Sequence, residues 1–300
     1  MTEVAASDQL LVVIDPVARR NDGEAVRIAK DVLSAGATTK VCLPDGPEEF
    51  ARALRRRGSR RPVVVGDDRA LLRAVSVLHR QRELAGCALS VVPVGGAISL
   101  VRSLGVPTGA VAGARAVLDG VERRLDLLVD DSDGVVLGAL RIPPLAARPG
   151  AGMGTTGTDE EDRESESDAE PGASSGHPWL RTCQSLVRTL VPVRPSRTAS
   201  ANGGSGPSRL RVEVDGVTLV DLDQPVEGVS VAPGDAGVAE VEVRPVSVGA
   251  EASPLLARGS TVTVSGAHFR YRADALVSGP VRTRTWTVRA GAWGLTLPGA

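Results

Sequence analysis

The chain has 300 residues, of which 42% are hydrophobic, 24% are charged and only 2% are aromatic, and its formal net charge is −1. A chain of this length can bury a core in one large domain or in two ordinary ones. The near-zero charge and the few aromatic rings that could stack on bases argue against a nucleic-acid partner.

The N-terminus and the cysteines indicate the compartment. The first residues, MTEVAASDQL, lack the basic start and apolar run of a signal peptide. No apolar run approaches the roughly 20 residues that span a bilayer. Cys42, Cys87 and Cys183 are widely spaced, with no CxxC pair, and this favours reduced structural thiols over metal ligands. We therefore expect a cytoplasmic protein.

The first part of the chain alternates between two kinds of segment. Short apolar runs such as LLVVID predict buried strands, and segments such as NDGEAVRIAKDVLSAG carry apolar residues at helical spacing. This alternation predicts an α/β domain over residues 1–145 with a mostly parallel sheet. Because ligands of such sheets bind beyond the carboxyl ends of the strands, the turns at 66–70 and 93–99 are the expected ligand site. The expected strands span 10–15, 38–44, 62–68 and 88–96, and the expected helices span 21–36, 47–58 and 69–84.

The pattern changes twice after residue 145. Residues 146–208 are poor in hydrophobic residues and rich in glycine, serine and acids, which predicts a disordered acidic insert and linker. Within it, WLRTCQSLVRTLVPV (179–193) predicts one short amphipathic helix, which either docks on the second domain or makes a peripheral membrane contact. From residue 209 to 300 apolar and polar residues alternate, which predicts an antiparallel β-sandwich domain.

Two turns carry motifs that resemble those of a known family. In VVVGDDRALL (63–72) a run of valines ends in a glycine and enters a helical pattern, as in turns that bind phosphate through free backbone N–H groups. PVGGAISLVR (93–102) follows the next expected strand and leads into SLGVP (103–107). The order and intervals of these segments resemble the diacylglycerol kinase catalytic family. This family includes bacterial lipid kinases and sphingosine kinases and is related in fold to NAD kinases.

The resemblance implies a reaction, its cofactors and a set of site residues. It implies transfer of phosphate from ATP, with Mg²⁺, to the hydroxyl of a lipid such as diacylglycerol, and a homodimer through the β domain. Asp274 corresponds to the general base and Asp68 to an acid near the phosphates or the metal. The implied nucleotide-binding residues are Gly66, Asp68, Arg69, Gly95 and Gly96, the catalytic residues are Asp68 and Asp274, and the surviving acids that could hold a metal are Asp235 and Glu240.

Both turns depart from the family pattern at the positions that would approach phosphate. The family has Gly-Gly-Asp-Gly-Thr where this chain has GDDRA (66–70), and Ile98 and Ser99 replace an asparagine and an aspartate. At about 5 Å and an effective dielectric of about 20, Asp67 would repel each phosphate charge by about 3 kcal/mol. Arg69 brings a Cβ where the backbone must come close, although its guanidinium could pair with phosphate. We therefore expect a lipid kinase-like protein whose activity is weak or lost. The alternative is a non-catalytic, pseudokinase-type module that binds or regulates through the cleft between its domains or through the acidic insert.

Overall fold

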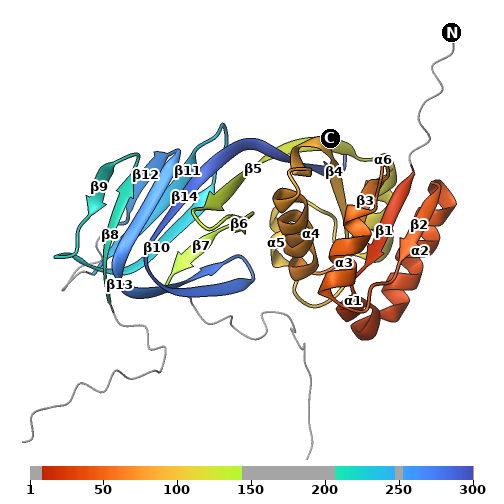
Figure 1. The fold of residues 1–300 in the computed structure, drawn as a ribbon, viewed down its shortest axis with the longest axis horizontal. Helices are drawn as coiled ribbons and strands as arrows, with labels where there is room; N and C mark the ends of the chain where they lie inside the picture. Colours follow the sequence, from red (N-terminus) through yellow and green to blue (C-terminus); the bar gives the residue numbers. More distant parts are fainter. Residues whose placement is uncertain (1–8, 144–206, 247–252, 300) are drawn as a thin grey trace, which may run out of the picture. The chain divides into compact units, whose positions relative to one another are not determined.

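The computed structural model describes residues 9–143, 207–246 and 253–299. In the first of these ranges four strands, in the order β2-β1-β3-β4, pair in parallel, as Figure 1 shows. They lie where the sequence predicts strands. The elements of this part are β1 (Leu10–Ile14), α1 (Pro16–Asn21), α2 (Gly23–Gly36), β2 (Thr39–Cys42), α3 (Pro47–Arg55), β3 (Arg61–Gly66), α4 (Asp68–Arg80), η1 (Leu84–Gly86), β4 (Ala88–Pro93), α5 (Ser99–Ser103) and α6 (Ala110–Asp119).

The parallel strands are apolar throughout because both of their faces are covered. All five residues of β1 are buried. Leu11 and Val13 belong to a core with residues of α3 and α4, whereas Val12 and Ile14 belong to a core with residues of α2 and α6. Successive side chains of a strand point to opposite faces, so an uninterrupted apolar run is what a sheet between two helical layers requires.

The remaining strands are antiparallel to one another and surround a separate core. Alternate residues are buried, as in β8 and β11, which is the period that the sequence shows from residue 209 on. The core contains Tyr271 and Trp286, whose rings meet edge to face at 5.2 Å. These strands are β5 (Val121–Asp130), β6 (Val135–Val136), β7 (Leu140–Ile142), β8 (Ser208–Val214), β9 (Val217–Val220), β10 (Pro225–Pro233), β11 (Ala239–Pro245), β12 (Leu255–Gly259), β13 (Thr261–Ala273) and β14 (Leu276–Leu297).

The strand pairing corrects two predictions. Strands β10 and β13 are joined both through β7 and through β8, so hydrogen bonding continues around the core, whereas a sandwich would have two separate sheets. The long strands β13 and β14 have register shifts, which lie between Ser265 and Tyr271 in β13 and between Arg289 and Trp293 in β14, and irregularities of this kind bend a strand locally. The prediction of a mostly parallel sheet holds for β1 to β4, while antiparallel pairs predominate in the whole sheet.

The predicted boundary near residue 145 divides strands that pair directly. Strand β7 pairs with β10 and β13, and the end of β14 pairs with β5 and, in parallel, with β4. Residues up to 143 and from 207 on accordingly belong to one compact unit. A division into independently folding domains stays a prediction, and the expected insert with its helix at 179–193 lies outside the described residues. No helix in the described ranges is long and apolar enough to cross a bilayer.

Candidate functional site

The turn between β3 and α4 is closed by its own carboxylate. Asp67 is the N-cap of α4, and its Oδ1 accepts hydrogen bonds from the N–H groups of Arg69 and Ala70, both at 3.1 Å. Aspartate is a preferred N-cap because its oxygen satisfies amides that have no partner within the helix. Gly66 is required by packing, since a Cβ there would lie 2.6 Å from the Ala70 Cβ. The first amides of α4 are therefore already bonded, and the Arg69 side chain is exposed.

Asp68 joins this turn to the second one. Its side chain is 3% exposed, and its carboxylate accepts hydrogen bonds from Leu100 N at 3.0 Å, Val101 N at 2.9 Å and Ser99 Oγ at 3.2 Å. The backbone N–H of Asp68 also donates to the carbonyl of Ala97 at 2.8 Å. The two turns that the sequence singles out thus lie together, with Asp68 bonded to the start of α5.

The glycines of the second turn differ in their surroundings. Gly95 has a φ of +121°, a backbone conformation that residues with a side chain rarely adopt. A Cβ there would lie 3.5 Å from the Asp67 Cβ. Gly96 has no atom within 4 Å of the position of a Cβ. Gly95 is therefore required by the backbone conformation, while a Cβ at Gly96 would meet open space.

Asp274 lies in the tight turn between β13 and β14, with φ +50. Its carboxylate accepts hydrogen bonds from the N–H groups of Leu137 and Gly138, both at 2.8 Å, and of Ala139 at 3.0 Å. Residues 137–139, which we call the strap, connect β6 to β7. A Cβ at Gly138 would lie 2.7 Å from Leu100 Cδ1 and 3.0 Å from Asp274 Oδ1, so the strap passes closely between α5 and Asp274.

Burial raises the pKa of Asp274 above its ordinary value, the three strap amides oppose this rise, and the nearby charge of Asp68 adds to it. Asp68 is bonded to Leu100 N, and Gly138, which is bonded to Asp274, lies against the Leu100 side chain. The structure therefore brings together the two predicted catalytic acids from distant parts of the sequence.

A third buried acid, Asp15, directly follows the carboxyl end of β1. Asp15 is 2% exposed and caps α1, where its Oδ1 accepts a hydrogen bond from Val17 N at 2.8 Å. Its Oδ2 is ion-paired with Arg73 of α4 at 2.5 Å, and the Arg73 guanidinium lies 5.4 Å from the centre of the Phe50 ring. The sequence signal for this cap is an aspartate directly before a proline, since proline favours the first helical position.

The predicted metal ligands do not form a metal centre. Asp235 is exposed, and Glu240 is ion-paired with Arg258 at 2.6 Å. Within the described ranges no group of three or more His, Cys, Asp or Glu side chains could hold a metal ion. The loop that follows Asp235 is instead held by Asp126, whose carboxylate accepts hydrogen bonds from Gly237 N and Gly291 N, both at 2.7 Å.

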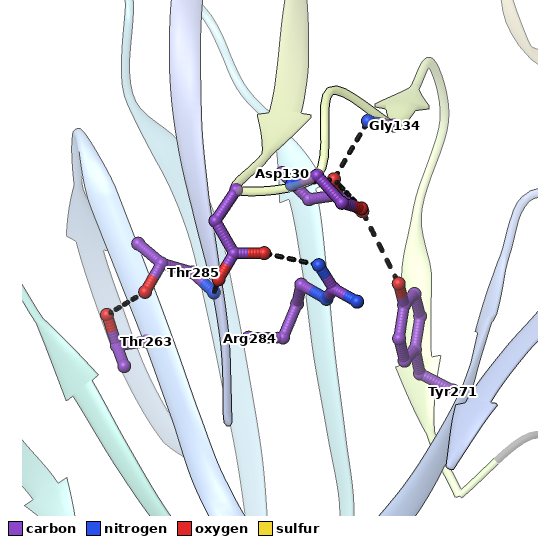
Figure 2. Close-up of polar contacts among 8 residues, drawn as sticks. Asp130, Gly134, Thr263, Tyr271, Arg284 and Thr285 are labelled. Carbon is purple, nitrogen blue, oxygen red and sulfur yellow. Dashed lines mark hydrogen bonds and ion pairs between the residues drawn. The ribbon is translucent and has the colours of Figure 1, made fainter. Parts of the chain in front are cut away.

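A polar cluster that the sequence did not reveal surrounds the β5–β6 turn, as Figure 2 shows. Asp130 accepts hydrogen bonds from Ser132 N and Gly134 N, both at 2.8 Å, and its Oδ2 lies 3.4 Å from the hydroxyl of Tyr271, which donates to it. Burial raises the pKa of Tyr271. The next residue of the turn, Asp131, is ion-paired with Arg284.

The same turn also contacts α4. His79 Nε2, in the last turn of that helix, lies 2.8 Å from Asp133 Oδ1. The β5–β6 turn thus links the helix that begins at Asp68 to strand β13, which ends one residue before Asp274.

Comparison with known proteins identifies the fold. No family model matches the sequence, and no curated protein matches it. Among solved structures, a diacylglycerol kinase from Bacillus anthracis strain Sterne aligns with a TM-score of 0.63 at 11% identity, over 98% of each chain. Two structures described as candidate diacylglycerol kinases from the same strain give TM-scores of 0.66 and 0.64 at 11% and 12% identity, with the same coverage. At this identity the likeness shows the fold alone. The chain therefore has the fold of these diacylglycerol kinases, as its motifs implied.

Proposed function

We propose that the chain is a protein of the diacylglycerol kinase family in which ATP-dependent phosphoryl transfer to a lipid hydroxyl is weak or lost. It acts instead as a non-catalytic binding or regulatory module, with a diacylglycerol-like lipid as its default ligand. One observation carries this proposal: the backbone N–H groups at the ends of the strands are bonded to the protein's own carboxylates. Asp67 occupies the start of α4, Asp68 that of α5, and Asp274 the strap.

Phosphoryl transfer requires the opposite arrangement. The protein's contribution to that reaction is mainly to position the phosphates and to offset their charge with N–H groups and cations. Here the carboxylates of Asp67 and Asp68 are bonded to the amides at the starts of α4 and α5, and Arg73 is already paired with Asp15. A phosphate charge about 5 Å from Asp67 would be repelled by about 3 kcal/mol at an effective dielectric of about 20.

Mg²⁺ needs several oxygen ligands in an octahedral arrangement, and within the described ranges no group of three or more His, Cys, Asp or Glu side chains is placed to hold a metal ion. A Mg²⁺ ion would have to be held mainly by the nucleotide phosphates. Homodimerisation through the β strands and the cytoplasmic location stay predictions.

A second candidate is an active lipid kinase that uses ATP and Mg²⁺. The raised pKa of Asp274 beside a second buried acid favours it, because perturbed carboxyl pairs are typical of acid–base sites. In this candidate Asp274 is the general base toward the lipid hydroxyl, and the exposed Arg69 binds phosphate as a fork of N–H donors.

Calorimetric titration with Mg·ATP and Mg·ADP separates the two candidates. A ligand whose concentration equals its dissociation constant stabilises a protein by only about 0.4 kcal/mol. Since we propose a dissociation constant for Mg·ATP in the millimolar range or above, we expect millimolar Mg·ATP to stabilise the wild-type protein very little. The double variant Asp67→Gly/Arg69→Gly removes the cap and the Cβ, and we expect it to bind Mg·ATP more tightly.

The matched control is Asp22→Gly, which removes an aspartate N-cap from α2, and its ATP affinity should equal that of the wild type. Low-micromolar binding of Mg·ATP by the wild-type protein, together with phosphorylation of a lipid, would contradict the proposal and establish the active kinase.

A further inference from the structure

A groove runs between the edge strand β2 and helix α3. Among the described strands, β2 pairs with β1 alone and so forms one edge of the sheet. The groove has a volume of about 320 Å³. Residues 49, 52 and 53, which lie on one face of α3, line it, and so does Arg56, the C-cap of the helix. Lys40 of β2 also lines it, together with Leu43 and Pro44 from the loop that leads to α3.

The cations around this groove have no acidic partner among the described residues. Lys40, Arg52, Arg55 and Arg56 are exposed, and no ion pair is found for them in those ranges, whereas the adjacent Arg57 is paired with Glu83. The acids nearby are Glu48 and Glu49 in the first turn of α3, and Asp45, which is paired with Arg19. The positive charge is therefore concentrated toward the C-terminal end of α3.

An apolar side chain stands among these cations. Leu43 is 53% exposed and shares the groove with Lys40 and Arg52. Two structural effects account for part of this pattern: arginines in a last helical turn interact favourably with the helix dipole, and a lysine on an edge strand hinders strand pairing. Neither effect calls for an exposed leucine that shares a groove with three cations, Lys40, Arg52 and Arg56.

We propose that this basic face, formed by Lys40, Arg52, Arg55, Arg56 and Leu43, docks on the surface of an anionic lipid bilayer. Basic side chains are attracted by anionic headgroups within about a Debye length, and an exposed leucine between them can enter the boundary of the acyl chains. A nucleic acid fits less well, because the aromatic ring of α3, Phe50, is fully buried and cannot stack on a base.

Binding of the full-length protein to vesicles tests this face. The vesicles contain phosphatidylglycerol mixed with phosphatidylcholine, with pure phosphatidylcholine vesicles as the reference, and bound protein is measured by sedimentation. Each basic side chain near an anionic surface is expected to contribute about fivefold to the partition coefficient. We therefore expect Arg52→Gln/Arg56→Gln to bind about 25-fold more weakly, and Leu43→Ser to bind more weakly at every salt concentration.

The matched control is Arg115→Gln/Arg123→Gln, which removes two exposed arginines that likewise have no ion pair among the described residues. It should bind as the wild type does, and urea unfolding should show that all variants are folded.

Several results would overturn the proposal. The first is equal binding to anionic and to pure phosphatidylcholine vesicles, and the second is an equal loss of vesicle binding in the test and control variants. The third is displacement of the protein from the vesicles by inorganic phosphate at the same concentration as the anionic lipid, which would indicate a site for a soluble anion. Tighter binding to duplex DNA than to the vesicles, lost in the same variant, would assign the face to nucleic acid. The assay contains no nucleotide, so its outcome is independent of the proposed loss of ATP binding.

Discussion

Replacement of Asp68 by alanine tests whether the buried acids serve the structure or a phosphate. The side chain bonds the amides of Leu100 and Val101, and these two residues are 8% and 0% exposed. Leaving a buried donor without a partner costs about 1–3 kcal/mol, so the loss of both bonds should lower the free energy of unfolding by about 2–6 kcal/mol. Since typical stabilities are about 5–15 kcal/mol, the effect would be large.

Equilibrium unfolding in urea, followed by circular dichroism, measures this loss through the shift of the transition midpoint. The control is Asp235→Ala, which removes an exposed aspartate and should change stability by no more than about 0.5 kcal/mol. Asp68→Asn retains one acceptor oxygen, so its loss of stability should lie between those of Asp68→Ala and Asp235→Ala. An Asp68→Ala protein as stable as the Asp235→Ala control would refute the structural role, since an acid kept for metal or phosphate can be removed without loss of stability.

Two further predictions concern the strap and Asp274. Gly138→Ala should destabilise the protein by about 1–3 kcal/mol, because its Cβ would lie 2.7 Å from Leu100 Cδ1. The control Gly96→Ala has open space around the Cβ and should leave stability unchanged. Equal urea-unfolding midpoints for the two variants would contradict the prediction and show that the strap can move away. Because the folded-state pKa of Asp274 is raised, its contribution to stability is fully present below the ordinary aspartate pKa and is lost as pH rises through the raised value. The stability of Asp274→Asn relative to the wild type should therefore increase with pH over that range, and parallel pH profiles in urea unfolding would contradict this.

Local pattern was sufficient for the four parallel strands, for helices α2, α3 and α4, and for the turn between β3 and α4. The valines of β3 and the helical spacing after Asp67 predict a strand that turns into a helix, because each periodicity depends only on neighbours in the chain. For the same reason the alternating residues after 209 predict strands. The sequence could not show that Asp67 bonds the amides of its own helix, although an aspartate before a helical pattern is the usual N-cap signal.

Only the tertiary structure decided which distant segments meet. The pairing of Leu295 with Leu89 and the bonds from the strap to Asp274 join residues far apart in the sequence. The pattern of one segment does not determine its partner, because many strands share the same period and their register depends on packing over the whole core. Sequence by itself therefore determined the types of the elements whose pattern is regular, and it showed the residues that stand in place of glycine. The fold decided that Asp15, Asp67, Asp68 and Asp274 face the protein's own amides and an arginine, because buried charges must find partners and the nearest donors are those at the strand ends.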